Sequence, residues 1–141
     1  MGKNTILFYK KLNKKIDVVV VFAKYNNKWL LTKHKDRDTW EVCGGHIENK
    51  ENIYDAAKRE LYEESGAIID KAKLIGYYSF VLSGKRNYGA VFSCDVISFD
   101  NLPNYEMKEI CLKEEFPLNT TYPLTYKRLL KEVCSCNDKC F

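Results

Sequence analysis

The 141-residue sequence lacks the features that mark membrane and secreted proteins. No apolar run approaches the ~20 residues that a membrane-spanning helix needs, and the run from Val18 to Ala23 has only the length of a strand. Four lysines interrupt the region where a signal peptide would carry its apolar segment, namely Lys10, Lys11, Lys14 and Lys15. We therefore expect a cytoplasmic protein with no membrane partner.

The sequence also lacks internal repeats, low-complexity tracts and an obvious linker. With 45% hydrophobic residues, a chain of this length can bury one sizeable core and has no room for a second. We expect residues 1–141 to form a single domain of the mixed α/β class.

The six cysteines do not form a recognisable disulfide or zinc pattern. Cys43, Cys94 and Cys111 fall in strand-like or loop segments, and we interpret them as reduced, small apolar residues. The last three, from Cys134 on, are spaced C-x-C-x₃-C, which lacks a fourth ligand and does not match the common zinc pairs. An ordinary chain end is the better interpretation of that segment.

The formal net charge of +4 is modest. It suits a small anionic substrate, but by itself it does not indicate a nucleic-acid-binding surface, so a nucleic acid is not the expected partner. Basic residues gather before Trp40, at Lys33 to Arg37, and Lys85-Arg86 lies in a separate turn. Any of these could equally be a solvated loop charge.

The stretch from Trp40 to Ala67 is the most informative part of the chain. Asn52 is a good N-cap and Gly66 a good C-terminal stop, so the residues between them, Ile53 to Ser65, should form a helix. At about 100° per residue, Glu60, Glu63 and Glu64 would then lie within roughly a third of its circumference. Ala57 and Leu61 on the neighbouring flank could pack against a sheet.

Three carboxylates on one helical face repel one another unless a cation lies between them. Glu60 and Glu64 alone, as like charges at i and i+4, cost a few tenths of a kcal/mol in an isolated helix. A hard divalent cation such as Mg²⁺ would relieve this, and protein-bound Mg²⁺ usually carries phosphate. Arg59 lies beside the acidic face, where it could pair with Glu51 from the preceding loop. The alternative is an ordinary solvated acidic helix.

The spacing of these residues resembles the Nudix box. Gly45 is followed after five residues by Glu51, and after seven more by Arg59-Glu60-Leu61, then by Glu63-Glu64 and Gly66-Ala67. The pattern constrains nine positions over 23 residues, and every fixed Gly, Glu and Arg is present at its spacing. There are two departures: Cys43 stands where many relatives have proline, and Ala67 where a larger aliphatic residue is usual.

The resemblance implies a Nudix-type α/β/α sandwich with a mixed β-sheet, the box helix on one side and the C-terminal helix on the other. It also implies hydrolysis of a nucleoside diphosphate linked to another moiety, with Mg²⁺ or Mn²⁺ neutralising the phosphate and activating a water for in-line attack.

The resemblance further assigns roles to individual residues. By it, Glu63 and Glu64 hold the metal with the Gly44 carbonyl, and Glu60 is either a ligand or the residue that takes the water's proton. Glu51 and Arg59 would organise this site, and a glutamate from a later loop would complete it. The candidates for this later glutamate are Glu109, which we prefer, and Glu106. The candidates for substrate binding are Arg37 and Gly45.

Substrate choice follows by elimination. The proline of ADP-ribose-specific relatives, some sixteen residues beyond the box, is absent, as are the tyrosine of dinucleoside polyphosphate enzymes and the NADH-type motif. What remains is similar to the small MutT-like triphosphatases, including those acting on oxidised purine nucleotides. We therefore expect a purine nucleoside triphosphate to be cleaved to monophosphate and pyrophosphate. The alternatives are an RNA 5′-pyrophosphohydrolase and a non-catalytic nucleotide sensor.

Outside the box, alternating and β-branched segments predict several strands and one further helix. The predicted strands are Ile16–Ala23, Trp29–Thr32, Leu74–Leu82, Tyr88–Phe99 and Met107–Leu112, and the predicted helix is Leu124–Val133 after Pro123.

Overall fold

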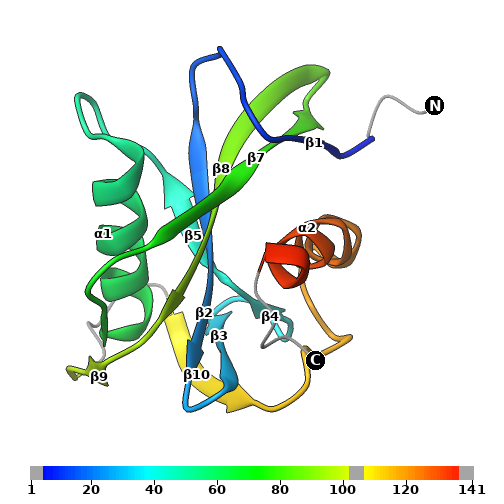
Figure 1. Ribbon diagram of the computed structural model, residues 1–141. Helices are drawn as coiled ribbons and strands as arrows, with labels where there is room; N and C mark the ends of the chain where they lie inside the picture. The colour runs from blue at the N-terminus through cyan, green and yellow to red at the C-terminus, as the bar shows by residue number, and fades with distance from the viewer. Residues whose placement is uncertain (1–4, 102–106, 137–141) are drawn as a thin grey trace.

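The computed structural model describes residues 5–101 and 107–136, and it has three layers. Helix α1 (Ile53–Ser65) covers one face of a mixed sheet and helix α2 (Pro123–Cys136) covers the other, as Figure 1 shows. The expected α/β/α sandwich is therefore confirmed. No helix within the described ranges is long and apolar enough to cross a membrane.

The main sheet has eight strands in the order β1-β7-β8-β2-β3-β10, with β4 paired to β3 and β5 paired to β2. Only β2 and β8 run parallel; the other pairs in this sheet are antiparallel. A second, two-stranded sheet joins β6 to β9. The strands are β1 (Leu7–Tyr9), β2 (Val18–Tyr25), β3 (Lys28–His34), β4 (Trp40–Glu41), β5 (Cys43–His46), β6 (Ala67–Ile68), β7 (Lys73–Leu82), β8 (Lys85–Asp95), β9 (Ser98–Phe99) and β10 (Met107–Lys113).

Two tight hairpins connect consecutive strands. Asn26 and Asn27 join β2 to β3 with φ of 50° and 65°, and Ser83 and Gly84 join β7 to β8 with φ of 51° and 76°. Two consecutive residues of positive φ give a turn whose twist matches that of the strands, and asparagine and glycine tolerate this conformation best. The second turn is thus two residues long, and β8 already begins at the predicted turn residue Lys85.

Helix α1 begins and ends at the predicted residues. The side chain of Asn52 accepts a hydrogen bond from the Asp55 N–H at 2.8 Å, and Gly66 closes the helix with φ of 74° and an N–H bond to the Tyr62 carbonyl. Asp55 answers Asn52 through its side chain, accepting from the Asn52 amide at 3.0 Å. Capping at both ends therefore holds the helix that carries the three glutamates.

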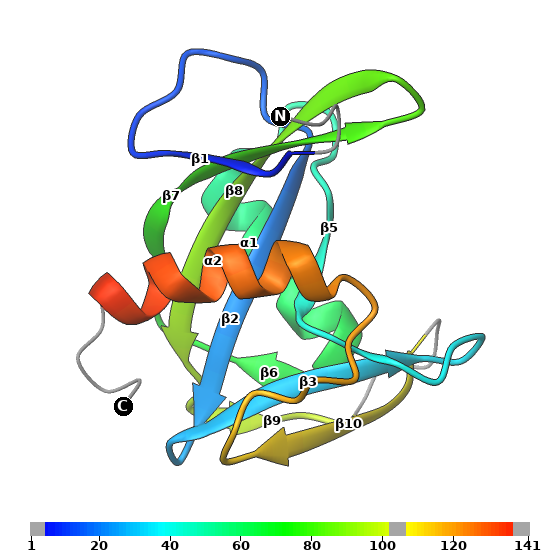
Figure 2. The same ribbon diagram turned by 90° about the vertical axis from the view of Figure 1, so that its right-hand side faces the viewer.

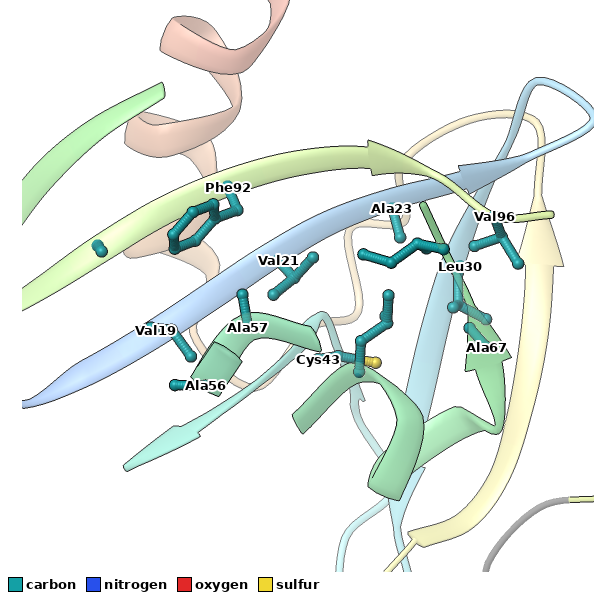
Figure 3. Packing of buried hydrophobic residues seen from close by; sticks show 13 residues of the cluster. Val19, Val21, Ala23, Leu30, Cys43, Ala56, Ala57, Ala67, Phe92 and Val96 are labelled. Atoms are coloured by element: carbon teal, nitrogen blue, oxygen red, sulfur yellow. The ribbon is translucent and has the colours of Figure 1, made fainter. Parts of the chain in front are cut away.

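Each face of the sheet has its own core. Towards α1, Ala56, Ala57 and Leu61 are fully buried, and Figure 3 shows Ala56 and Ala57 facing Val19 and Val21 of β2. Small residues on the helix allow it to lie close to the sheet. Towards α2, the buried side chains are Phe22, Trp29, Leu31, Val42, Ile75, Tyr78, Val91, Tyr126, Leu129 and Val133. Figure 2 shows α2 crossing in front of β2 and β8.

The structure corrects two of the predicted segments. The predicted strand Tyr88–Phe99 is broken, because the Val96 N–H bonds to the Lys24 carbonyl and the chain then leaves the main sheet to pair as β9 with β6. The glycine pair Gly44-Gly45, which lies in none of the predicted strands, belongs to strand β5, which pairs with the first half of β2. Both features depend on partners far away in the sequence.

Candidate active site

The box glutamates of α1 lie against strand β5. A Cβ atom on Gly45 would collide with the Glu60 carboxylate, so only glycine allows the helix carboxylate to approach the strand this closely. The Gly44 N–H donates to Glu64 Oε1 at 2.9 Å. The glycine pair and the acidic face of the helix therefore lie together in space. We call Gly44, Gly45, Glu51, Arg59, Glu60, Glu63 and Glu64 the carboxylate unit.

Arg59 is the centre of this unit. Its guanidinium makes a bidentate pair with Glu51, Nε to Oε2 at 2.7 Å and Nη2 to Oε1 at 2.9 Å, as the sequence predicted. Its Nη1 also donates to Glu60 at 2.7 Å and to Glu63 at 2.9 Å. Charge-assisted pairs of this geometry are among the strongest side-chain hydrogen bonds.

The loop between β5 and α1 is braced by contacts that the sequence pattern did not indicate. Arg59 Nη2 donates to the His46 carbonyl at 3.1 Å, and Arg59 Nη1 lies 3.7 Å from the Glu48 carboxylate. The Glu48 N–H donates to Glu51 Oε1 at 3.0 Å. Glu48 could have been suspected only from its place three residues before Glu51. These bonds make the loop a rigid connection between strand and helix.

Burial and charge shift the pKa values of this unit in opposite directions. The hydrogen bonds from Arg59 lower the pKa of Glu51. Burial raises the pKa of Glu60 to about 7, against the hydrogen bond from Arg59 and with a further contribution from the neighbouring Glu63. A carboxyl with such a pKa is poised to exchange a proton near neutral pH.

The carboxylates of Glu60, Glu63 and Glu64 suit a hard divalent cation, since such cations prefer oxygen ligands. In the described residues, no group of three or more acidic, histidine or cysteine side chains is already arranged around a common cation position. Arg59 instead neutralises Glu60 and Glu63 directly, while Glu63 keeps 47% of its side chain exposed. A cation bound here would take over part of this charge compensation.

The other predicted site residues pair with residues outside the box. Glu109 on β10 stands opposite Lys33 on β3 and pairs with its Nζ at 3.7 Å. Lys33 also covers the ring of Trp40, at 4.4 Å from the ring centroid. In the structure the partner of Glu109 is therefore Lys33, and the role of Glu109 as a further ligand stays a prediction. Glu106 lies outside the described residues.

Arg37 belongs to a second polar network. Its Nη1 donates to Glu41 Oε2 at 2.6 Å, and the pKa of Arg37 is raised by this partner. The same Glu41 oxygen accepts from the Thr121 hydroxyl at 2.8 Å, while the Thr121 N–H bonds to the Trp40 carbonyl. Glu41, which was not a predicted site residue, ties the segment before the box to the start of α2.

Comparison with known proteins agrees with this architecture. The sequence model of the NUDIX domain matches residues 14–126, which is most of the chain. The chain belongs to the Nudix family. It is thus an enzyme of the Nudix pyrophosphohydrolase family, and members of this family typically use a divalent metal.

Individual relatives are similar over different shares of the chain. YtkD of Bacillus subtilis, provisionally named an 8-oxo-dGTP diphosphatase, is 31% identical over 115 residues, covering 81% of this chain and 72% of its own. The oxidized purine nucleoside triphosphate hydrolase of Mus musculus is 37% identical over 71 residues, 49% of this chain and 46% of its own.

Solved structures share the fold. A crystal structure of the Bacillus subtilis pyrophosphohydrolase BsRppH has a TM-score of 0.83 and 26% identity, covering 95% of this chain and 92% of the other. A MutT Nudix hydrolase from Burkholderia pseudomallei has a TM-score of 0.66 at 19% identity, covering 85% of this chain and 99% of the other, and shows the fold alone.

Proposed function

We propose that this Nudix enzyme hydrolyses a purine nucleoside triphosphate, oxidised purines included, to the monophosphate and pyrophosphate with Mg²⁺ or Mn²⁺. The observation that carries the proposal is the acidic face of α1 held against the glycine pair of β5. The names of the relatives YtkD and the mouse hydrolase support the substrate class.

In this proposal Glu63 and Glu64 hold the cation together with the Gly44 carbonyl. When bound, the cation neutralises the phosphate oxygens and activates the attacking water. The chain itself supplies the positions: Arg59 locks the loop to the helix, and the close approach at Gly45 sets where the Glu60 carboxylate lies.

Glu60 is either a further ligand or the general base. A base works best when its pKa lies near the operating pH, and the raised pKa of Glu60 meets this condition. Because a carboxylate base and an activated water both work better deprotonated, turnover should increase towards alkaline pH. Glu51 serves as the anchor of Arg59, and Arg37 is a candidate for substrate contact from outside the unit.

The test is a panel of substrates offered in parallel to the purified protein with Mg²⁺ and then with Mn²⁺. The panel holds standard and oxidised purine nucleoside triphosphates, ADP-ribose, nucleotide sugars and a 5′-triphosphate RNA, with products separated by ion-exchange chromatography. We expect monophosphate and pyrophosphate from a triphosphate. Preference for ADP-ribose or a sugar nucleotide over every triphosphate would leave only the family assignment standing.

A second arm separates an enzyme from a nucleotide sensor. A sensor binds nucleotide without turnover, whereas the intact set of Glu60, Glu63 and Glu64 predicts turnover that stops when the cation is chelated. Nucleotide binding measured by calorimetry in the absence of any hydrolysis, with either metal, would favour the sensor.

A further inference from the structure

The positive charge of this protein is concentrated at one end of the fold. Residues 5–17 and 80–89 hold six of the 23 basic residues and one of the 19 acidic residues. The rest of the chain therefore carries 17 basic and 18 acidic residues, close to neutrality. The modest net charge of the whole chain conceals this separation.

Two segments far apart in the sequence meet at this end. The connection from β1 to β2 carries Lys10, Lys11, Lys14 and Lys15, and the hairpin from β7 to β8 carries Lys85 and Arg86. Figures 1 and 2 both place the connection and the hairpin at the same end of the molecule. The pairing of β1 with β7 and the bond from Arg86 Nη1 to the Thr5 carbonyl, at 3.3 Å, join them. We call residues 5–17 and 80–89 the basic end.

Most lysines of the basic end are exposed. Lys11, Lys14, Lys15 and Lys85 are all exposed, and within the described ranges no acidic side chain pairs with them. The acidic residue of this end, Asp17, accepts from the Tyr88 N–H at 3.1 Å. An uncompensated cluster of ammonium groups attracts a ligand with several regularly spaced negative charges.

Aromatic rings lie between these charges. Phe8, Tyr9 and Tyr88 are half-buried in the same end, and Lys10 and Arg128 each lie 5.5 Å from the centroid of the Phe8 ring. Partly exposed rings among lysines can stack unpaired bases, which a duplex does not offer. This combination fits a single strand better than a duplex or a lipid surface.

The basic end also borders the loop between β5 and α1. The Ile47 N–H bonds to the Asp17 carbonyl at 3.0 Å, and Val18 pairs with His46 at the end of β5. A polyanion bound across the lysines therefore has one end beside the loop that leads into the box.

From this arrangement we propose that the basic end binds the phosphodiester backbone of single-stranded RNA. The inference stands independently of the proposed substrate, because it concerns binding outside the carboxylate unit. The net charge of the whole chain did not lead us to expect a nucleic acid as a partner, and this proposal revises that expectation.

The experiment measures fluorescence anisotropy of a 12-nucleotide oligouridylate with a 5′-hydroxyl and a 3′ fluorophore, over a series of KCl concentrations. Because the oligonucleotide begins with a 5′-hydroxyl, it carries no 5′-triphosphate that could bind at the carboxylate unit. Neutralisation of four or five phosphates predicts that log K falls with log[KCl] with a slope of about −3. A duplex of the same length and vesicles containing phosphatidylserine are the competing arms.

Two variants of equal charge change make the test specific. Replacing Lys11, Lys14 and Lys15 by Gln should reduce the slope by about 2 and weaken binding roughly tenfold at low salt. Replacing the exposed Lys28, Lys71 and Lys127 by Gln removes the same charge elsewhere and should leave the slope within about 0.5 of the original.

Circular dichroism and turnover of the free nucleotide should be unchanged in both variants, which separates this inference from the proposed function. Absence of RNA binding, equal weakening by both variants, or stronger binding to the duplex or the vesicles would overturn the inference.

Discussion

At the residue scale, the glutamates of α1 differ in what surrounds them. Glu60 keeps 14% of its side chain exposed and touches Arg59, whereas Glu63 keeps 47% exposed and Glu64 accepts the Gly44 N–H. Identical side chains on one short helix therefore have unequal surroundings. Residues of one type differ here because the sheet contacts only one side of the helix.

The first prediction concerns the two proposed ligands. Glu63→Gln and Glu64→Gln keep the size of the side chain but remove its charge, so we expect turnover to fall by a factor of ~100 or more. The far-ultraviolet circular dichroism should not change, because neither side chain belongs to the core. Near-normal turnover of either variant at saturating Mg²⁺ would show that the ligand assignment is wrong.

The second prediction concerns Arg59. With 21% of its side chain exposed and Glu51 at 14%, the pair is partly shielded from water, so removing the guanidinium leaves Glu51 without its partner. Arg59→Ala should lower the free energy of unfolding by roughly 1–3 kcal/mol, measured by urea denaturation. Lys58→Ala, which removes an exposed charge one residue away, is the matched control and should change stability little.

The same pair predicts a pH dependence. Because Arg59 lowers the pKa of Glu51 below its ordinary value of 4.5, the pair contributes its full stability above that value. The contribution is lost as the pH falls through the lowered pKa, since protonated Glu51 no longer pairs. The stability difference between the original protein and Arg59→Ala should thus shrink between about pH 5 and pH 3. A difference that stays constant over this range would contradict the pairing.

At the scale of elements, α1 is held by capping at its ends and by alanines on its buried side. The close approach of its Glu60 carboxylate to β5 depends on Gly45, and its attachment to the preceding loop depends on Arg59. Strand β1 is held differently, because the Phe8 ring lies directly over Gly76, where a Cβ would collide with it. Local bonds dominate in the helix, and distant contacts dominate in the short strand.

The third prediction is a test of the helix cap. Asn52→Ala removes the acceptor of the Asp55 N–H and should cost about 1 kcal/mol of stability. Asn52→Ser restores a capping oxygen and should recover most of the loss. The measurement is thermal unfolding of the three proteins side by side; equal melting temperatures for alanine and serine would mean that the cap contributes nothing.

At the scale of the whole molecule, both faces of the sheet must stay covered for the core to remain dry. Cys43, 1% exposed, lies in the core beneath α1, and burial raises its pKa well above the usual range. Burial likewise raises the pKa of Cys94 to about 12. Thiols with such pKa values are almost entirely protonated at pH 8 and do not react with disulfide reagents.

The fourth prediction uses these thiols to report global unfolding. In a variant whose other four cysteines are replaced by serine, Cys43 and Cys94 should not react with Ellman's reagent at pH 8 within an hour. In denaturant, both thiols should react within minutes. Fast reaction of the native protein, with its circular dichroism intact, would show that the sheet opens locally on the α1 side.

Helix α1 and the order of the box residues were determined by the sequence itself. The bonds within a helix and its caps join residues three to five positions apart, so Asn52 and Gly66 were enough to place both helix ends. The spacing of Glu51 and Arg59 likewise predicted their pairing. The long strands β2, β7 and β10 followed from their β-branched and apolar residues, within about two positions at each end.

Only the tertiary structure decided the rest, because it depends on partners distant in the sequence. Glycines have low strand propensity, so β5 exists only because β2 pairs with it, and Gly45 meets Glu60 only because α1 packs on the same strand. Glu109 pairs with Lys33 because the register of β10 on β3 places these two residues opposite each other. The basic end arises in the same way, since some sixty residues separate its two segments and only the sheet brings them together.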